Sequence, residues 1–310
     1  IYRNYLTTYI KMSKPKIIIS TIDNNLFLWE LKRNFPYIKI LLIQNGVRLF
    51  EDKKDRKQLN KFFYQVALMK KPKKDIYEVD YVFTINNYFS KKYKKFYKCK
   101  TAPIGYFRNN NFLNKRKKIE KNTLYFISQY SNDYTKYNVE LPDKKILKYL
   151  NYYAYKKNKK LKILERTSDS AEFCEQELKY KNWKIYKPNK KEKINTYFSY
   201  SNAMNADVIV TIDSTLGYEL LSQGKKVAFF SIRNWAGNEP YYKFGYPKQL
   251  SINGPFWSNI FNENKFERIL DYLYSISEEK FHYNNKKVLN NLILFDKKNK
   301  TINKTIKSLL

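Results

Sequence analysis

The sequence predicts an α/β fold with two domains, each built around a parallel sheet. Short apolar runs of strand length alternate with longer amphipathic stretches along most of the chain, and this alternation is typical of parallel βαβ units. A polar stretch without apolar periodicity, residues 114–122, interrupts the series and is typical of an interdomain connection. We therefore expect one domain at residues 1–118 and a second at residues 119–310.

The first domain is predicted from its strand and helix signals. Asp23 or Asn24 can cap the first helix, whose apolar positions follow helical spacing. Pro36 ends that helix because proline cannot continue it. The predicted strands are residues 16–20, 38–43, 80–85 and 101–105, and the predicted helices lie between residues 24 and 35 and between residues 86 and 96.

The second domain repeats the pattern with more units. Its most apolar strand is predicted at residues 206–212, and Gly224 stands where a C′ glycine would end the helix that follows. The other predicted strands are residues 123–128, 161–165, 183–186 and 226–230. The predicted helices are 141–157, 170–181, 196–202, 214–223, 263–276 and from 286 onward; the last two are expected to pack back across the domains.

The chain is strongly basic, with 61 Lys and Arg against 28 Asp and Glu and a net charge of +33. A large positive field is compatible with nucleic-acid binding. It is also compatible with a coding bias combined with attraction to anionic ligands and lipid surfaces. The basic residues are spread along the whole chain and gather in no single arm, which favours the second interpretation.

Cysteine and histidine usage limits the chemistry. Cys99 and Cys174 lie far apart without a CxxC motif, and His282 is the only histidine. This predicts a reducing cytoplasm, no disulfide framework and no zinc site. No run reaches the roughly 18 apolar residues of a membrane-spanning helix, and no signal-peptide pattern is present. Because the chain begins with Ile1 and not Met, we expect either an N-terminal truncation or a domain cut from a longer protein.

The most informative motif is the turn from the predicted strand 206–212 into the next helix. Asp213-Ser214-Thr215-Leu216-Gly217 would place hydroxyls and unpaired backbone N–H groups at the carboxyl end of a parallel strand, where α/β folds bind ligands and a helix dipole favours phosphate. Glu219 follows one turn later and could reach a ribose. The alternative is that Ser214 or Thr215 is only an N-cap and Glu219 a solvated helix residue.

This motif resembles the donor-binding half of GT-B glycosyltransferases. Together with Thr21–Asn25 and Ile43–Arg48, residues Asp213–Glu219 are similar to bacterial surface-carbohydrate biosynthesis proteins, which act on capsule or lipopolysaccharide, some of them related to enzymes that use CMP-Kdo. The resemblance implies two Rossmann-like domains facing a cleft, with an N-terminal acceptor-side domain that is incomplete at its start. It also implies that Ser214 and Thr215 grip phosphate and that Glu219 contacts the nucleotide.

Catalysis would require a group on the N-terminal side of that cleft. Asp23 and Asn45 follow predicted strands, and a carboxylate there could act as general base or nucleophile. The alternatives are a helix cap for Asp23 and a simple turn for Asn45. Contacts to phosphate or to an acidic sugar are expected from Gln44, Gly46 and Arg48, with a solvated surface arginine as the alternative for Arg48.

The donor side has one further basic candidate and no metal signal. Arg166 directly follows the predicted strand 161–165 and is expected to help bind the donor. No Asp-x-Asp pair stands at a strand end as metal-dependent GT-A enzymes require. We therefore expect no metal and no other cofactor, with the charge of the leaving phosphate offset by the helix terminus and basic side chains.

The function expected from these features is transfer of a sugar from a nucleotide-sugar donor, CMP-Kdo or a similar one, to a surface polysaccharide or a lipid-linked acceptor. The enzyme is expected in the cytoplasm, with peripheral contact at the anionic inner face of the membrane. One alternative is a polyol-phosphate transferase of the CDP-glycerol type. Another is a non-catalytic basic nucleic-acid-binding protein, although no RNP or comparable motif is present.

Overall fold

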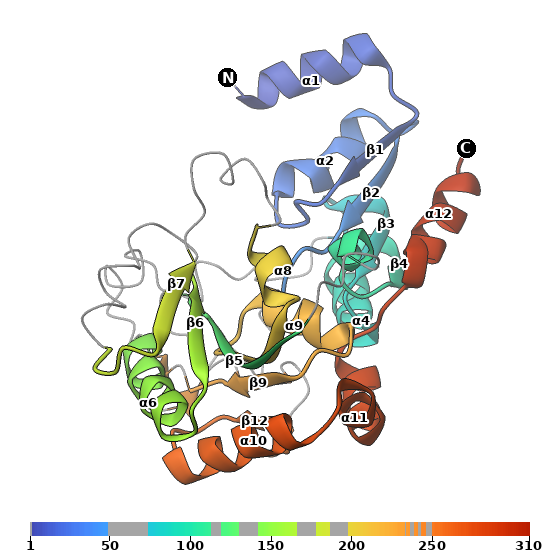
Figure 1. The fold of residues 1–310 in the computed structure, drawn as a ribbon. Helices are drawn as coiled ribbons and strands as arrows, with labels where there is room; N and C mark the ends of the chain where they lie inside the picture. Colours follow the sequence, from blue (N-terminus) through green and yellow to red (C-terminus); the bar gives the residue numbers. More distant parts are fainter. Residues whose placement is uncertain are drawn as a thin grey trace. The chain divides into compact units, whose positions relative to one another are not determined.

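The computed structural model describes residues 2–48, 74–112, 119–129, 142–165, 178–186, 198–232, 234–235, 239–240, 243–245 and 250–310. The predicted α/β class is confirmed, with two parallel sheets that belong to two compact units (Figure 1). Unit 1 consists of Ile1–Asn110 and Ile293–Leu310, and unit 2 of Asn111–Leu292. Residues 293–310, which the sequence assigned to the second domain, thus pack with the first sheet.

Unit 1 carries a four-stranded parallel sheet of order β1-β2-β3-β4. The cap of its helix α2 is Asn25, whose Oδ1 accepts a hydrogen bond from Phe27 N at 3.1 Å, and not Asp23 or Asn24 as expected. The elements are α1 (Tyr2–Ser13), β1 (Ile17–Ser20), α2 (Leu26–Asn34), β2 (Lys39–Ile43), β3 (Glu78–Thr84), α4 (Asn87–Phe96), β4 (Lys98–Pro103) and η1 (Phe107–Phe112).

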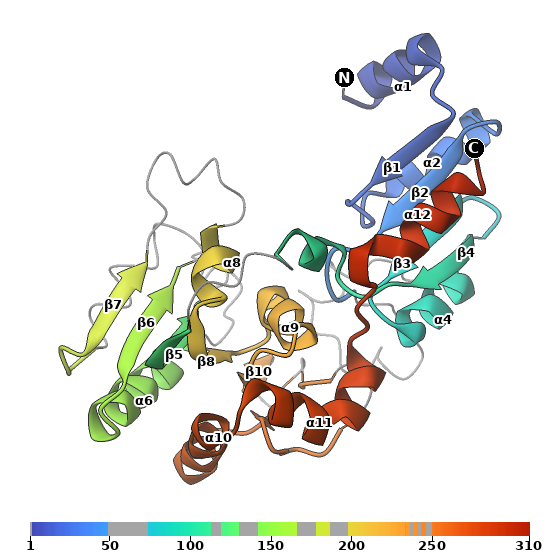
Figure 2. The same ribbon diagram turned by 45° about the vertical axis from the view of Figure 1, so that its right-hand side comes forward.

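Both faces of this sheet are covered (Figure 2). Between α2 and α4, the ring of Trp29 is buried and stacks on Tyr97 with ring centroids 3.8 Å apart. The opposite face carries Leu41 and Phe83, which form a buried cluster with Ile302 of α12 (Lys300–Lys307). Alternate strand residues point to opposite faces, so the sheet is buried on both sides although α12 comes from the far end of the chain.

The return of the chain into unit 1 depends on Gly105. Its φ of +78° lies in the left-handed region, and a Cβ at this position would lie only 1.7 Å from the carbonyl oxygen of Leu294. Gly105 also forms an antiparallel bridge with Phe295, and Asp296 N donates to Ile104 O at 3.1 Å. Only glycine permits this close approach of two backbones.

Unit 2 carries a six-stranded parallel sheet of order β12-β9-β8-β5-β6-β7. Starting from β5, the chain adds β6 and β7 on one side and then β8, β9 and β12 on the other. The strand order therefore reverses between β5 and β8, as in doubly wound folds. The elements are β5 (Glu120–Ile127), α6 (Asp143–Lys156), β6 (Lys160–Leu164), β7 (Trp183–Tyr186), α8 (Phe198–Ala203), β8 (Ala206–Thr211), α9 (Thr215–Ser222), β9 (Val227–Phe230), β10 (Asn234–Trp235), β11 (Glu239–Pro240), β12 (Trp257–Ser258), α10 (Glu263–Ser275), α11 (Glu278–Leu292) and, in unit 1, η3 (Lys297–Asn299).

Two boundaries differ from those expected. β5 begins at Glu120, inside the polar stretch read as the connection, because Glu120 pairs with Ala206 at the start of β8. The last predicted helix, from residue 286 onward, is two helices, α11 from Glu278 and α12. Most of the helix predicted at 170–181 lies outside the described residues.

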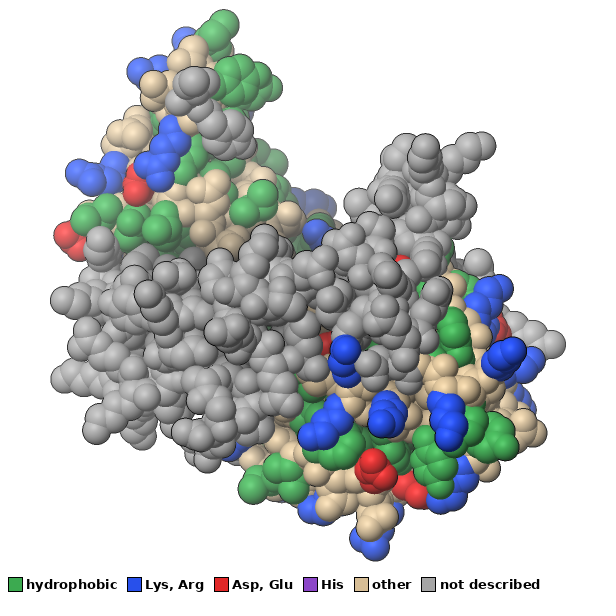
Figure 3. All heavy atoms as spheres, turned by 90° about the vertical axis from the view of Figure 1, so that its left-hand side faces the viewer, with side chains coloured by type: hydrophobic (Ala, Val, Ile, Leu, Met, Phe, Trp, Pro, Cys, Tyr) green, Lys and Arg blue, Asp and Glu red, His purple; other side chains and the backbone are tan. Residues whose placement is uncertain are grey.

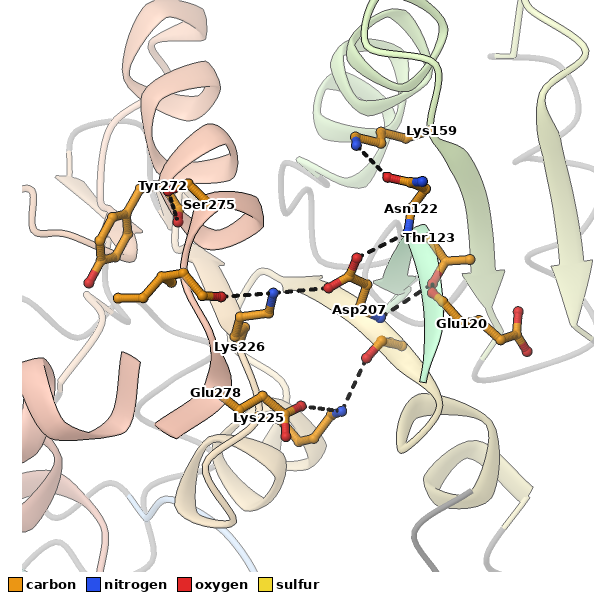
Figure 4. Close-up of polar contacts among 12 residues, drawn as sticks. Glu120, Asn122, Thr123, Lys159, Asp207, Lys225, Lys226, Tyr272, Ser275 and Glu278 are labelled. Carbon is orange, nitrogen blue, oxygen red and sulfur yellow. Dashed lines mark hydrogen bonds and ion pairs between the residues drawn. The ribbon is translucent and has the colours of Figure 1, made fainter. Parts of the chain in front are cut away.

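Two buried lysines hold the amino-terminal edge of the second sheet (Figure 4). Lys225 Nζ lies 2.5 Å from Glu278 Oε1, and Lys226 Nζ lies 2.9 Å from Asp207 Oδ1. Each ammonium group also donates to a backbone carbonyl oxygen, at 3.1 and 3.2 Å respectively. Charges taken out of water are stable only when paired and hydrogen-bonded in this way, so these pairs join β9 to β8 and to the start of α11.

Glu278→Ala should lower the free energy of unfolding by about 3 kcal/mol, because it leaves the ammonium group of Lys225 buried without its carboxylate. Glu279→Ala is the matched control, since Glu279 is an exposed acidic residue in the same first turn of α11. Urea unfolding followed by circular dichroism measures both. Equal losses in the two variants would show that the helix terminus matters and the buried pair does not.

Candidate functional site

A pocket of about 360 Å³ opens at the carboxyl edge of the sheet in unit 2. It lies where the strand order reverses, beyond the ends of β5, β6 and β8. Open α/β sheets bind their ligands at such a reversal, because the loops from the two sides diverge there. The lining residues are Ile127, Ser128, Gln129, Leu164, Glu165, Ser199, Ser214, Thr215 and Leu216.

The amino terminus of α9 supplies the part of this pocket that the sequence predicted. Ser214 is the N-cap residue, in extended conformation, and among the described residues its side chain makes no capping hydrogen bond. Its backbone N–H instead donates to Thr211 Oγ1 at 3.2 Å. The first-turn N–H groups of Thr215 and Leu216 have no acceptor within the helix. Hydroxyls and backbone donors at a positive helix end make a potential anion site.

A hydrogen-bond chain holds the pocket walls together. Asp213 N donates to Gln129 Oε1 at 3.0 Å, which ties the end of β8 to the end of β5. Gln129 N in turn donates to Asp143 Oδ1 at 3.0 Å, and Ser128 Oγ lies 3.4 Å from the same oxygen. Asp143 is fully buried in the first turn of α6. Beyond the paired ends of β5 and β8, the side chain of Gln129 thus links the two chain segments that leave the sheet on either side of the reversal.

The other two residues singled out in α9 are buried in the helix. A Cβ on Gly217 would lie 2.5 Å from Thr211 Cγ2, so Gly217 allows α9 to pack closely on β8. Glu219 is buried as well and is not one of the described residues that line the pocket. It is therefore not the solvated residue of the alternative interpretation, and its contact with a nucleotide stays a prediction.

Several pocket residues were missed from the sequence. Glu165 is buried at the carboxyl end of β6, directly before Arg166, which was singled out and lies outside the described residues. Gln129 follows β5, and Ser199 comes from α8. Asp213 was predicted because it is a polar residue at the end of an apolar strand. Glu165 and Gln129 have the same position relative to their strands, so the same pattern could have identified them.

In unit 1, the predicted residues converge beyond the ends of β1 and β2. Asp23 is fully buried, and Arg48 binds its carboxylate with two hydrogen bonds, Nε to Oδ2 at 2.8 Å and Nη2 to Oδ1 at 2.6 Å. The Tyr93 hydroxyl donates to Asp23 Oδ2 at 2.5 Å, and Asn45 N donates to Oδ1 at 3.2 Å. Two residues 25 positions apart therefore form a charge-assisted clamp.

This geometry gives Asp23 a positioning role. A general base must reach the hydroxyl that it deprotonates, whereas the carboxylate of Asp23 is buried and already accepts hydrogen bonds from three residues. Burial, and then the negative charge of Asp23, raise the pKa of the Tyr93 hydroxyl well above its usual value, so Tyr93 remains a donor. The catalytic role predicted for Asp23 stays a prediction that its burial does not favour.

The loop after β2 is held from both sides. Gln44 is buried; its Nε2 donates to Gly46 O at 2.8 Å and its Oε1 accepts from Ile85 N at 3.1 Å. Arg48 also donates to the side-chain oxygen of Asn45, which is exposed. Of the predicted group, Asn45 is thus the residue that combines a fixed position with an exposed amide.

The described residues contain neither a cluster of metal ligands nor a membrane-spanning helix. Among them, no group of three or more His, Cys, Asp or Glu side chains is placed to hold a metal ion. No described helix has both the length and the apolar character needed to cross a bilayer. The predicted independence from metal remains open to experiment.

A model of the O-antigen biosynthesis protein family matches residues 41–310. No curated protein matches the sequence. Similar solved structures are a UDP-GlcNAc 2-epimerase from Methanocaldococcus jannaschii (12% identity, TM-score 0.54, covering 99% of this chain and 80% of that one), a variant of the wall teichoic acid polymerase TagF (14%, 0.52, 95% and 72%) and a glycosyltransferase from Rickettsia africae ESF-5 (13%, 0.50, 99% and 79%). The epimerase is also known in complex with UDP-GlcNAc and UDP. At these identities the likeness shows the fold, which is the GT-B-like one that the resemblance implied.

Arg48→Lys should lower the free energy of unfolding by about 2 kcal/mol, because an ammonium group cannot reproduce the two parallel hydrogen bonds to a buried carboxylate. The control is Arg33→Lys at an exposed position of α2, which should change stability by less than about 0.5 kcal/mol. Guanidinium unfolding at neutral pH compares the two. If Arg48→Lys were as stable as the control, the clamp would not hold the loop.

Proposed function

The chain belongs to the family of O-antigen biosynthesis proteins, and from this premise we propose that it is a glycosyltransferase that uses a nucleotide-sugar donor. The observation that carries the proposal is the pocket at the strand reversal of unit 2, which has the amino terminus of α9 as one wall. Transfer of the sugar to an acceptor hydroxyl breaks its bond to the nucleotide, which departs with negative charge on the phosphate oxygen. A helix amino terminus stabilises that charge.

The donor is proposed to lie with its phosphates on Ser214 and Thr215. Gln129 keeps this turn in place through Asp213 N, so the first-turn donors are preorganised and need not move when the ligand binds. Support for a nucleotide sugar comes from the neighbouring epimerase, which binds UDP-GlcNAc and UDP. CMP-Kdo or a similar acidic sugar is the donor that we propose, and Arg166 would assist in binding it.

The acceptor is proposed to be a growing surface polysaccharide or a lipid-linked glycan. In unit 1, Asn45 is a stronger candidate than Asp23 for contact with this substrate. The side chain of Asn45 is exposed, while its backbone N–H donates to the buried carboxylate of Asp23. Gln44, Gly46 and Arg48 would then act by shaping the loop. We place the reaction in the cytoplasm, at the anionic inner face of the membrane.

A second candidate is polyol-phosphate transfer of the CDP-glycerol type. The observation in its favour is the similar fold of the teichoic acid polymerase. Both reactions would use the same phosphate contacts at α9, so the fold does not distinguish them. The identity of the bound nucleotide and of the transferred group would distinguish them.

Thr215→Glu should weaken nucleotide binding without unfolding the protein. A carboxylate in the first turn of α9 is favourable for the helix dipole, but it repels a phosphate at the same place. Binding should weaken by about tenfold or more. Calorimetric and thermal-shift titrations with CMP, CDP, UDP and GDP measure the affinity of wild type and variant.

The matched control is Asn264→Glu, which adds a carboxylate to the first turn of α10, away from the pocket. It should bind nucleotide as wild type does. Wild-type affinity in Thr215→Glu would show that phosphate does not bind at α9. A folded wild-type protein that binds none of the four nucleotides would overturn the donor assignment.

Transfer should proceed in the presence of EDTA at a rate within about twofold of the untreated enzyme, because the helix terminus and basic side chains are proposed to replace a metal ion. The assay uses the donor whose nucleotide binds best in the titration above. Complete loss of transfer, restored by Mg²⁺ or Mn²⁺, would sink the metal-independent mechanism.

A further inference from the structure

Helix α1 presents an apolar stripe to solvent. Tyr5, Tyr9 and Met12 are 65%, 59% and 78% exposed, and their spacing of four and three residues places them on one face of the helix. The Tyr5 and Tyr9 rings are stacked with centroids 6.5 Å apart. Three large apolar side chains in one row are more than the isolated exposed residues that any protein surface shows.

The same helix is held on unit 1 by its other side, so the stripe is not needed for folding. Ile10 is buried. Arg3 lies over the ring of Phe27 at 5.7 Å and forms an ion pair with Glu30 at 3.7 Å, both on α2. The packed side and the exposed stripe are therefore different faces of α1, which lies beside α2 (blue, Figure 1).

The surroundings of the stripe are basic. Helix α1 contains no acidic residue. Lys11 in its last turn is exposed, and so are Lys14 and Lys16, which follow the helix. Basic side chains are not confined to α1, since Figure 3 shows Lys and Arg side chains interspersed with hydrophobic ones on one face. On and directly after α1, an exposed apolar row and exposed cations therefore occur together.

We propose that α1 docks unit 1 onto an anionic lipid bilayer, with Tyr5, Tyr9 and Met12 inserted at the headgroup boundary and the lysines paired with lipid phosphates. Charge complementarity selects this occupant, because each Lys or Arg near an anionic leaflet adds to the attraction. Tyrosine also suits the boundary, since its ring is apolar and its hydroxyl stays hydrated. In this arrangement, α1 lies in the plane of the bilayer surface and does not cross the bilayer.

This inference rests on the proposed function for its purpose, which is to bring the enzyme to a lipid-linked acceptor, but its test contains neither donor nor acceptor. Failure of the docking would therefore leave nucleotide binding at α9 unaffected. Conversely, loss of nucleotide binding would leave the docking intact.

The experiment is co-sedimentation of the full chain with vesicles of phosphatidylglycerol and phosphatidylethanolamine, or of phosphatidylcholine alone. Wild type should bind the anionic vesicles at about 0.1 M NaCl and be largely released at about 0.5 M, where charge attraction is screened. The triple variant Tyr5→Ser/Tyr9→Ser/Met12→Ser should bind the anionic vesicles about tenfold more weakly. The control is Tyr283→Ser on α11, equally exposed at 78%, which should bind as wild type does.

A second variant separates insertion from attraction by charge alone. The chain already contains four tryptophans, so the emission of Met12→Trp is compared with that of wild type. The added indole, taken as the difference between the two, should shift its emission to shorter wavelength with anionic vesicles and be quenched by brominated lipid. An unshifted, unquenched indole would overturn the proposal, as would wild-type binding by the triple variant or equal losses in the triple variant and Tyr283→Ser. Concentration-dependent dimerisation that the triple variant abolishes, without vesicle binding by wild type, would assign the stripe to a second copy of the chain.

Discussion

The parallel pairing of β5 with β8 is the constraint on which the rest of unit 2 depends. β5 is the first strand of the unit, and β8 joins it only after the chain has added β6 and β7 on the other side. The loops that follow β5 and β8 must then leave the sheet in different directions. Gln129 spans that divergence with a single hydrogen bond to Asp213 N, so the pocket and the position of α9 follow from one strand pairing.

In unit 1, an ion pair joins the loops that follow neighbouring strands. The strands that the structure describes in this unit are added in one direction only, so they contain no reversal like that of unit 2. The loops after β1 and β2 are joined by the buried pair of Asp23 and Arg48. A buried ion pair of this kind adds little net stability compared with an apolar pair, but removing one partner is costly. It therefore serves to specify one arrangement of the loop that carries Asn45.

The sequence predicts what is local and misses what depends on strand order. The strand 206–212 and the turn at Asp213–Gly217 are contiguous, so apolar patterning and capping chemistry identify them. The neighbourhood of Glu165, Gln129 and Ser199 requires knowledge of which strands are adjacent. The partnership of Asp23 with Arg48 required the β1–β2 pairing for the same reason, and β12 is a two-residue strand without periodicity. Helix α1 went unpredicted because its apolar residues Tyr5, Tyr9 and Met12 face solvent and do not mark a buried face.

The closure of unit 1 by residues 293–310 has a consequence for biosynthesis. During synthesis, the strands of unit 1 leave the ribosome first. The sheet face that carries Leu41 and Phe83 is covered only when Ile302, near the end of the chain, has been made. All of unit 2 is synthesised in between. Domains generally fold in the order in which they emerge, but the core of unit 1 can be completed only after the whole of unit 2 has been synthesised. Until Ile302 has been made, the nascent chain carries the apolar face with Leu41 and Phe83 without its α12 cover.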